Sequence, residues 1–131
     1  MTTAAHAQQP NPEGRRFSPD QVRSIAPALE RYTQDRLYGD VWKRPGLSPR
    51  DRSLITIAAL TARGEAGALN YYADQALENG VKPAEISEMI THLAYYSGWS
   101  KAMATIGPVS EVFARRGIGP DQLPNVDPTP L

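Results

Sequence analysis

Residues 48–62, SPRDRSLITIAALTA, decide the fold class of this chain. Ser48 supplies a hydroxyl that can cap the first turn of a helix, and Pro49 is favoured at the first helical position. The residues that follow are apolar around nearly the whole circumference of such a helix. Their β-branched side chains would also permit a strand, but the cap and the length favour a helix. We therefore expect a central, buried helix here.

Helical spacing continues on both sides of this stretch, and strand alternation is sustained nowhere. Ser18 begins a similar cap, with Pro19 directly after it and Gln21 three residues on, as in a capping box. Pro27 should kink or restart this first helix. Further helices are expected over residues 68–78, 83–97 and 100–116, with a loop over 39–47. The predicted fold class is all-α, a compact helical domain of about five or six helices joined by short links.

The length of the chain is that of one ordinary domain, and its composition argues against several classes of partner and of chemistry. It has 131 residues, and 14 Lys plus Arg balance 14 Asp plus Glu. A net charge of zero is untypical of nucleic-acid-binding proteins and gives no attraction to anionic membranes. The absence of cysteine excludes disulfides, thiolate metal sites and thiol catalysis. With apolar runs too short to span a bilayer and no secretory signal, we expect a cytoplasmic protein.

The two ends of the chain differ in composition from its middle. Residues 1–16 are small and polar and include His6, which we expect to be inert, whereas residues 118–131 are rich in proline. We therefore expect an N-terminal irregular tail over 1–16, a helical domain over 17–117 and a Pro-rich C-terminal tail over 118–131.

Two stripes of side chains run along residues 85–99 if they form one helix. One stripe is apolar and should face the core. The other consists, within an arc of roughly 80°, of Glu85, Glu88, His92, Tyr96 and Trp99. Glu88 and His92 are four residues apart, close enough for a hydrogen bond, which would fix the tautomer of the imidazole and suit a general acid or base. The alternative is that His92 is an interface histidine and the aromatic rings pack between subunits.

Two arginines mark the beginning of the helix predicted over residues 48–62. Arg50 and Arg52 lie where free backbone N–H groups and a guanidinium can point at one negative charge, which suits an anion site. The alternative is an ion pair with Asp51 or with another helix.

Tyr71, Tyr72 and Lys101 are further candidates for a site. One tyrosine ring should belong to the core, and the other could line a cleft. Lys101 is either an ordinary surface lysine or a cation that faces the cleft. The histidines and carboxylates have no spacing typical of metal ligands, so we expect no metal and no cofactor.

Three segments occur in a long and specific order: GDVWKRPGLSPRDRSLITIAAL (39–60), ALENGVKPAEISEMITHLAYYSGWSKAM (76–103) and VSEVFARRG (109–117). Together they make the chain resemble the carboxymuconolactone decarboxylase family, part of the alkylhydroperoxidase D-like superfamily, from about Leu37 to Gly117. The resemblance implies an all-α fold that assembles with copies of itself as a homotrimer or homohexamer.

The resemblance also implies a cofactor-independent decarboxylation, in which a carboxymuconolactone loses carbon dioxide during the breakdown of aromatic compounds. His92 corresponds to the histidine of the family's LLHxAxYxG stretch and is the candidate acid or base, with Glu88 to orient it. Arg52 corresponds to the arginine of RxRSL and could hold a substrate carboxylate, also across a subunit boundary. Tyr72 stands where the family usually has a second histidine, and its phenol could donate to an enolate oxygen. Other candidates for substrate binding are Tyr96, Trp99, Lys101 and Trp42.

The sequence thus predicts a carboxymuconolactone decarboxylase-like lyase or isomerase that acts by proton transfer on a small carboxylated lactone or enol-type substrate. A non-catalytic oligomeric protein that binds a small molecule is the alternative, and a Schiff-base reaction at Lys101 is a third possibility. The thiol peroxidase activity of the superfamily is disfavoured because the chain has no cysteine.

Overall fold

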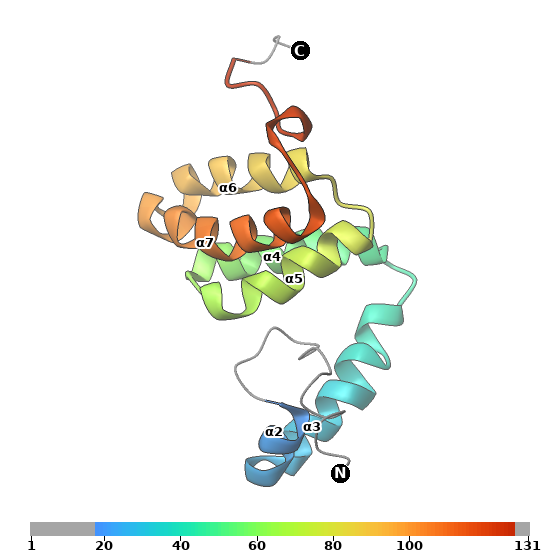
Figure 1. Ribbon diagram of the computed structural model, residues 1–131. Helices are drawn as coiled ribbons and strands as arrows, with labels where there is room; N and C mark the ends of the chain where they lie inside the picture. The colour runs from blue at the N-terminus through green and yellow to red at the C-terminus, as the bar shows by residue number, and fades with distance from the viewer. Residues whose placement is uncertain (1–17, 128–131) are drawn as a thin grey trace.

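The computed structural model describes residues 18–127, which fold mostly into helices (Figure 1). The body of the protein consists of α4 (Pro49–Arg63), α5 (Ala66–Glu78), α6 (Pro83–Ser97) and α7 (Trp99–Arg116). Helix α4 packs against each of the other three. No strand occurs within residues 18–127. The predicted all-α class is confirmed.

An N-terminal arm, residues 18–38, precedes the body. It consists of α2 (Pro19–Ile25), α3 (Pro27–Tyr32) and a π-helical turn, η1 (Thr33–Tyr38); a short 3₁₀ turn, η2 (Val41–Lys43), follows it. The predicted break at Pro27 is confirmed, because α2 ends at Ile25, Ala26 lies between the two helices, and α3 begins at Pro27. Helices α2 and α3 lie apart from α4–α7 (Figure 1), so apolar side chains such as Ile25, 86% exposed, find no cover on the body.

Helices α2 and α4 begin at the predicted caps, Ser18 and Ser48. Ser48 Oγ accepts a hydrogen bond of 3.0 Å from the Asp51 N–H at the start of α4. At the other end of α4, Gly64 turns the chain with a φ of 70°, which favours glycine. The Gly64 and Glu65 N–H groups bond back to the Thr61 and Leu60 carbonyls. Because this turn needs so few residues, α5 begins two residues before the predicted start.

Gly98 makes the turn between α6 and α7. Its φ of 107° lies in a region that side chains rarely adopt, so the predicted end of α6 at this glycine is confirmed. Helix α7 begins directly at Trp99, one residue before the predicted start at Ser100. It then continues through Pro108 to Arg116.

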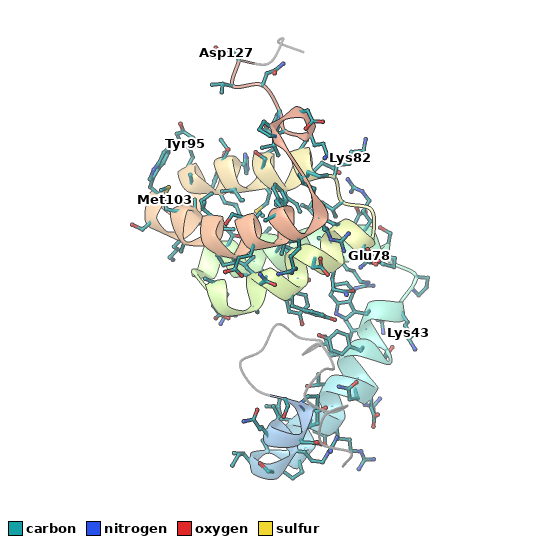
Figure 2. All side chains as sticks on the ribbon, viewed as in Figure 1. Lys43, Glu78, Lys82, Tyr95, Met103 and Asp127 are labelled. Carbon is teal, nitrogen blue, oxygen red and sulfur yellow. The ribbon has the colours of Figure 1, made fainter. Side chains whose placement is uncertain are left out.

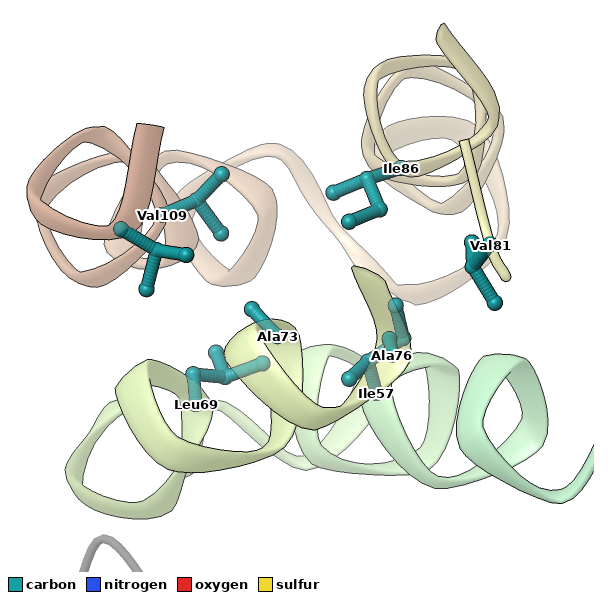
Figure 3. Close-up of a cluster of buried hydrophobic side chains, with 8 residues drawn as sticks. Ile57, Leu69, Ala73, Ala76, Val81, Ile86 and Val109 are labelled. Atoms are coloured by element: carbon teal, nitrogen blue, oxygen red, sulfur yellow. The ribbon is translucent and has the colours of Figure 1, made fainter. Parts of the chain in front are cut away.

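The core lies between the helices of the body (Figure 3). Its buried apolar members are Ile57 from α4, Leu69, Ala73 and Ala76 from α5, Val81 from the following link, Ile86 from α6, and Val109 and Val112 from α7. The two alanines of α5 allow the neighbouring helices to approach it closely. Burial of these side chains is the main force that holds the body together.

The expectation that α4 is buried all round is wrong. Its buried side chains are Ser53, Ile57 and Thr61, whereas Ile55 is 55% exposed. Helices α5, α6 and α7 cover one side of α4, whereas the described chain places only short segments near the other, such as η2 and the side chains of Leu37 and Leu47. The apolar residues on that side therefore remain accessible in a single subunit.

Arg50 joins the beginnings of α4 and α6. Its guanidinium bonds to Asp51 at 3.0 Å and to Glu85, whose second oxygen accepts the Lys82 N–H at 2.9 Å. The Lys82 N–H and then the Arg50 guanidinium lower the pKa of the Glu85 carboxyl, and the two carboxylates raise the pKa of Arg50. Arg50 was predicted to form either an anion site or an ion pair. The structure shows the ion pair, because both terminal nitrogens of the guanidinium already bond to carboxylates.

The chain after α7 continues along the body for a few residues. The Ile118 N–H bonds to the Phe113 carbonyl, and a 3₁₀ turn, η3, covers Pro120–Gln122. The predicted N-terminal tail, with His6, and residues 128–131 lie outside the described residues. No described helix is long and apolar enough to cross a membrane.

Truncation of Val112 tests the position of the core. Val112 is fully buried and Val126 is 96% exposed, so the same substitution removes the same atoms from two environments. Val112→Ala should lower the free energy of unfolding by about 2 kcal/mol, and Val126→Ala by less than about 0.5 kcal/mol. Chemical denaturation of both variants measures the difference. Equal losses would place the core elsewhere.

The acid sensitivity of the Arg50–Glu85 pair gives a second test. Because folding lowers the pKa of Glu85 from its ordinary value of 4.5, the carboxylate stabilises the fold above that pH and loses this contribution as the pH falls through the folded value. Glu85→Gln should therefore lower the melting temperature at pH 7, and the difference from the parent should vanish toward strongly acidic pH. A difference independent of pH would contradict the assigned ion pair.

Candidate functional site

Helix α6 presents the two predicted stripes without Trp99, because α6 ends at Ser97 and Trp99 begins α7. On its inner side Ile86 is fully buried, and Met89 and Ile90 pack against the core. On its outer side Glu88 and His92 are exposed. The 3.6-residue period of the helix thus separates the side chains that build the core from those that carry polar chemistry.

His92 lies in an open groove of about 590 Å³ between α4 and α6. The groove is lined by Leu54 and Ala58 of α4 and by Ala84, Glu85, Glu88, Met89, His92 and Leu93 of α6. The imidazole stacks on the Tyr96 ring, with centroids 4.7 Å apart. Within residues 18–127 it forms no hydrogen bond with Glu88, although the two share the groove. The groove therefore combines apolar walls with an imidazole and carboxylates.

The groove holds no free cation in a single subunit. Of its two carboxylates, Glu85 is paired with Arg50, and Glu88 has no ion pair in the described part of the chain. Among the described residues, the only other titratable side chain that lines the groove is that of His92. An anionic substrate would need a positive charge from outside it.

Arg52 lies on a different face of α4, in a second hollow of about 180 Å³. The hollow is lined by Arg52, Ile55 and Thr56 of α4 and by Leu37, Val41, Trp42 and Leu47. One Arg52 Nη donates to the Arg44 carbonyl at 3.1 Å, whereas its buried Nε–H has no hydrogen-bond partner. Arg52 has no carboxylate partner within residues 18–127 and lies beside an apolar surface, which suits recognition of a carboxylate by its terminal N–H groups.

Tyr72 lines a third hollow, of about 120 Å³, next to that of Arg52. Its walls are Tyr38, Trp42, Tyr71, Tyr72, Gln75 and Asn79. The Tyr72 hydroxyl lies 2.6 Å from the hydroxyl of Tyr38, and its ring meets that of Tyr71 edge-on. Both Tyr71 and Tyr72 are half-buried and line the hollow. Tyr38 was missed in the sequence, because the π-helical turn that carries it gives no recognisable pattern.

The remaining predicted residues lie on the surface. Tyr96 is 78% exposed, and Trp99, also exposed, meets the ring of Tyr95 edge-on at 5.8 Å. The exposed side chain of Lys101 runs past the Gly64 turn and has no ion pair among residues 18–127. Tyr95 and Met103 project at the end of the body where α6 turns into α7 (Figure 2).

One subunit does not bring all the predicted residues together. Trp42 lines the hollows of both Arg52 and Tyr72, so these three residues are neighbours. The His92 groove shares no lining residue with either hollow. No group of three His, Asp or Glu residues within 18–127 could hold a metal ion.

The chain is similar in sequence to one protein family and to two known proteins. Residues 27–111 match the family described as the carboxymuconolactone decarboxylase family. The chain is 38% identical over 86 residues to a 4-carboxymuconolactone decarboxylase of Acinetobacter baylyi, a match that covers 66% of this chain and 64% of that protein. It is also 38% identical over 61 residues to a nitrosuccinic acid decarboxylase of Metarhizium robertsii, covering 47% of this chain and 43% of that protein.

The matched part of the chain thus spans less than two thirds of the length of either relative. The family match covers more than half of the chain, including the helices that form the His92 groove and the hollow of Tyr72. The chain belongs to the carboxymuconolactone decarboxylase family.

Proposed function

We propose that the protein is a cofactor-independent decarboxylase-like lyase that acts on a small carboxylated lactone or enol-type substrate. The observation that carries the proposal is an accessible imidazole, His92, in an apolar groove beside the carboxylate of Glu88. Two relatives named as decarboxylases support the reaction class.

Decarboxylation breaks one carbon–carbon bond, and the electron pair of that bond stays on the substrate. In a lactone or enol-type acid this pair moves onto the carbonyl oxygen and forms an enolate, which donors stabilise. A proton must then be delivered to carbon. The imidazolium of His92 can supply that proton and recover it from solvent. The apolar side chains of Leu54 and Leu93 disfavour the charged carboxylate relative to neutral carbon dioxide.

The reaction also needs a cation to hold the substrate before it loses carbon dioxide. Arg52 has no carboxylate partner in the described part of the chain, but in its own subunit it lies in a hollow that is separate from the His92 groove. A second copy of the chain could bring its Arg52 to the groove and exclude water at the same time. The active site then lies between subunits.

Exposed apolar side chains support assembly of the chain with copies of itself as a homotrimer or homohexamer. On the body they form an aromatic patch consisting of Tyr95, Tyr96, Trp99, Met103 and Ile106. On the arm they include Ile25, Leu29 and Tyr32. Surfaces of this kind are typical of contacts between subunits.

A non-catalytic small-molecule-binding protein is the second candidate. The observation that favours it is the aromatic hollow around Tyr72, which offers phenols but no imidazole. The Schiff-base reaction has less support, because Lys101 is exposed and a nucleophilic lysine needs a desolvated amine.

Turnover of 4-carboxymuconolactone by the purified protein tests the proposal. Release of carbon dioxide and the change in ultraviolet absorbance should show catalysis by the parent chain. His92→Ala should lower kcat by about 10²- to 10⁴-fold, because it removes the proton donor. Thr91→Ala is the matched control, since Thr91 is exposed on the same turn and does not line the groove. It should retain the parental rate.

Two outcomes would contradict the proposal. A His92→Ala variant that keeps the parental kcat would contradict the assignment of His92. An inactive parent that gains turnover through Tyr72→His would indicate that this chain acts on a different substrate.

A further inference from the structure

Asn79 ends α5, and its side chain is tied to the beginning of α4. The amide nitrogen of Asn79 donates to Ser53 Oγ at 2.9 Å. Ser53 is 1% exposed, and its own hydroxyl donates to the Pro49 carbonyl at 2.7 Å. Because a serine hydroxyl has one proton, Ser53 faces Asn79 only as an acceptor. The contact therefore requires a hydrogen-bond donor at position 79, which the amide supplies.

The backbone of the turn after Asn79 is fixed as well. The Gly80 N–H donates to the Leu77 carbonyl at 3.1 Å, and the Val81 N–H donates to the Ala76 carbonyl at 2.8 Å. Val81 is 2% exposed and anchors the far side of the turn in the core. Gly80 is exposed and has a φ of 99°, which favours glycine. Packing and hydrogen bonds thus restrain an exposed glycine that directly follows Asn79.

An asparagine that precedes a glycine can lose its amide group without an enzyme. The backbone nitrogen of the glycine attacks the side-chain carbonyl carbon of the asparagine, a new C–N bond forms, and the amide leaves as ammonia. Water then opens the resulting five-membered imide at either carbonyl and gives aspartate or isoaspartate. Glycine favours the attack because it has no Cβ to crowd its nitrogen. Residues 79–80 are the only Asn-Gly pair in the sequence, whereas Asn70 precedes the bulky Tyr71.

The folded turn opposes this reaction in two ways. At the Asn79 ψ of 4°, the Gly80 nitrogen nearly eclipses the backbone nitrogen of Asn79 and so points away from its Cβ. The ring can close only after ψ rotates, which breaks the hydrogen bond from Gly80 to Leu77. The side-chain amide must also leave Ser53 to meet the attacking nitrogen. Opening of the turn therefore controls the reaction.

We infer that Asn79 is a site of deamidation, which its hydrogen bond to Ser53 delays in the folded chain. The modified residue carries a carboxylate in place of the amide donor. This carboxylate faces the acceptor side of the Ser53 hydroxyl, whose proton remains on the Pro49 carbonyl. Two acceptors cannot form a hydrogen bond, so the tie between α4 and α5 is lost. The modification is independent of the proposed lyase reaction.

Peptide mapping by mass spectrometry tests the site in the full chain. During incubation at mildly alkaline pH, conversion of the amide to the acid at Asn79 should be much faster in guanidinium chloride than in the folded chain. Asn70 should react far more slowly under both conditions and is the internal control. Ser53→Ala should raise the rate at Asn79 in the folded chain about fivefold, because it removes one hydrogen bond that holds the amide.

Val112→Ala is the matched control for loss of stability. It truncates a fully buried core residue but removes no hydrogen bond of Asn79, so it should leave the rate in the folded chain unchanged. A double-mutant cycle tests the consequence of the modification. Asn79→Asp should lower the melting temperature of the parent more than that of Ser53→Ala, since only the parent opposes the new carboxylate with an acceptor.

The inference fails under any of four results. The first is a chain whose Asn79 stays intact when unfolded, and the second is an equal rate in the folded and unfolded chains. The third is equal rates at Asn79 in folded Ser53→Ala and Val112→Ala, which would assign the protection to global stability. The fourth is an equal effect of Asn79→Asp on the melting temperature in the presence and absence of the Ser53 hydroxyl.

Discussion

The first turns of α4 hold the surrounding segments in place, and the candidate sites depend on this anchorage. Arg50 pairs with Glu85 at the beginning of α6. Ser53 Oγ accepts the Asn79 amide at the end of α5. Arg52 donates to the Arg44 carbonyl in the preceding loop. Because these contacts point in different directions from one short stretch, α4 holds in place the beginning of α6, the end of α5 and the preceding loop.

Helix α4 also separates two groups that a decarboxylase would need at one substrate, the imidazole of His92 and the guanidinium of Arg52. Leu54 and Ala58 face the His92 groove, whereas Arg52 and Thr56 face the opposite hollow. At 100° per residue these two pairs lie on nearly opposite sides of the helix. Because the helix is rigid, Arg52 cannot reach a substrate that is bound in the His92 groove of the same subunit. This constraint, together with the exposed aromatic patch and arm, is why we place the proposed reaction between subunits.

Tyr72 offers different chemistry from the histidine that the family resemblance implies. The family resemblance implies a histidine at the position of Tyr72, where a base would act. A phenol is a poor base at neutral pH but a good donor, and a second phenol strengthens it. Tyr72 therefore suits donation of a hydrogen bond, while the polar stripe of α6 suits proton transfer.

The sequence predicted the features of the fold that depend on local chemistry. Ser48 and Ser18 caps, the break at Pro27 and the turn at Gly98 follow from backbone preferences that neighbours in sequence determine. The burial of α4 was overestimated, because apolar residues such as Ile55 serve a surface as well as a core, and periodicity cannot distinguish them. The two stripes of α6 were predicted, but the contact between Tyr38 and Tyr72 was not. It depends on where a π-helical turn meets α5, which no short pattern encodes.

Subunit mixing tests most directly whether the site is shared between copies. His92→Ala and Arg52→Ala chains, each inactive alone, are combined in equal amounts, unfolded and refolded together, and assayed for decarboxylation. Random assembly places an intact His92 opposite an intact Arg52 at about one site in four, so the mixture should recover about a quarter of the parental activity. A mixture as inactive as its two components would contradict a site formed by His92 of one subunit and Arg52 of another.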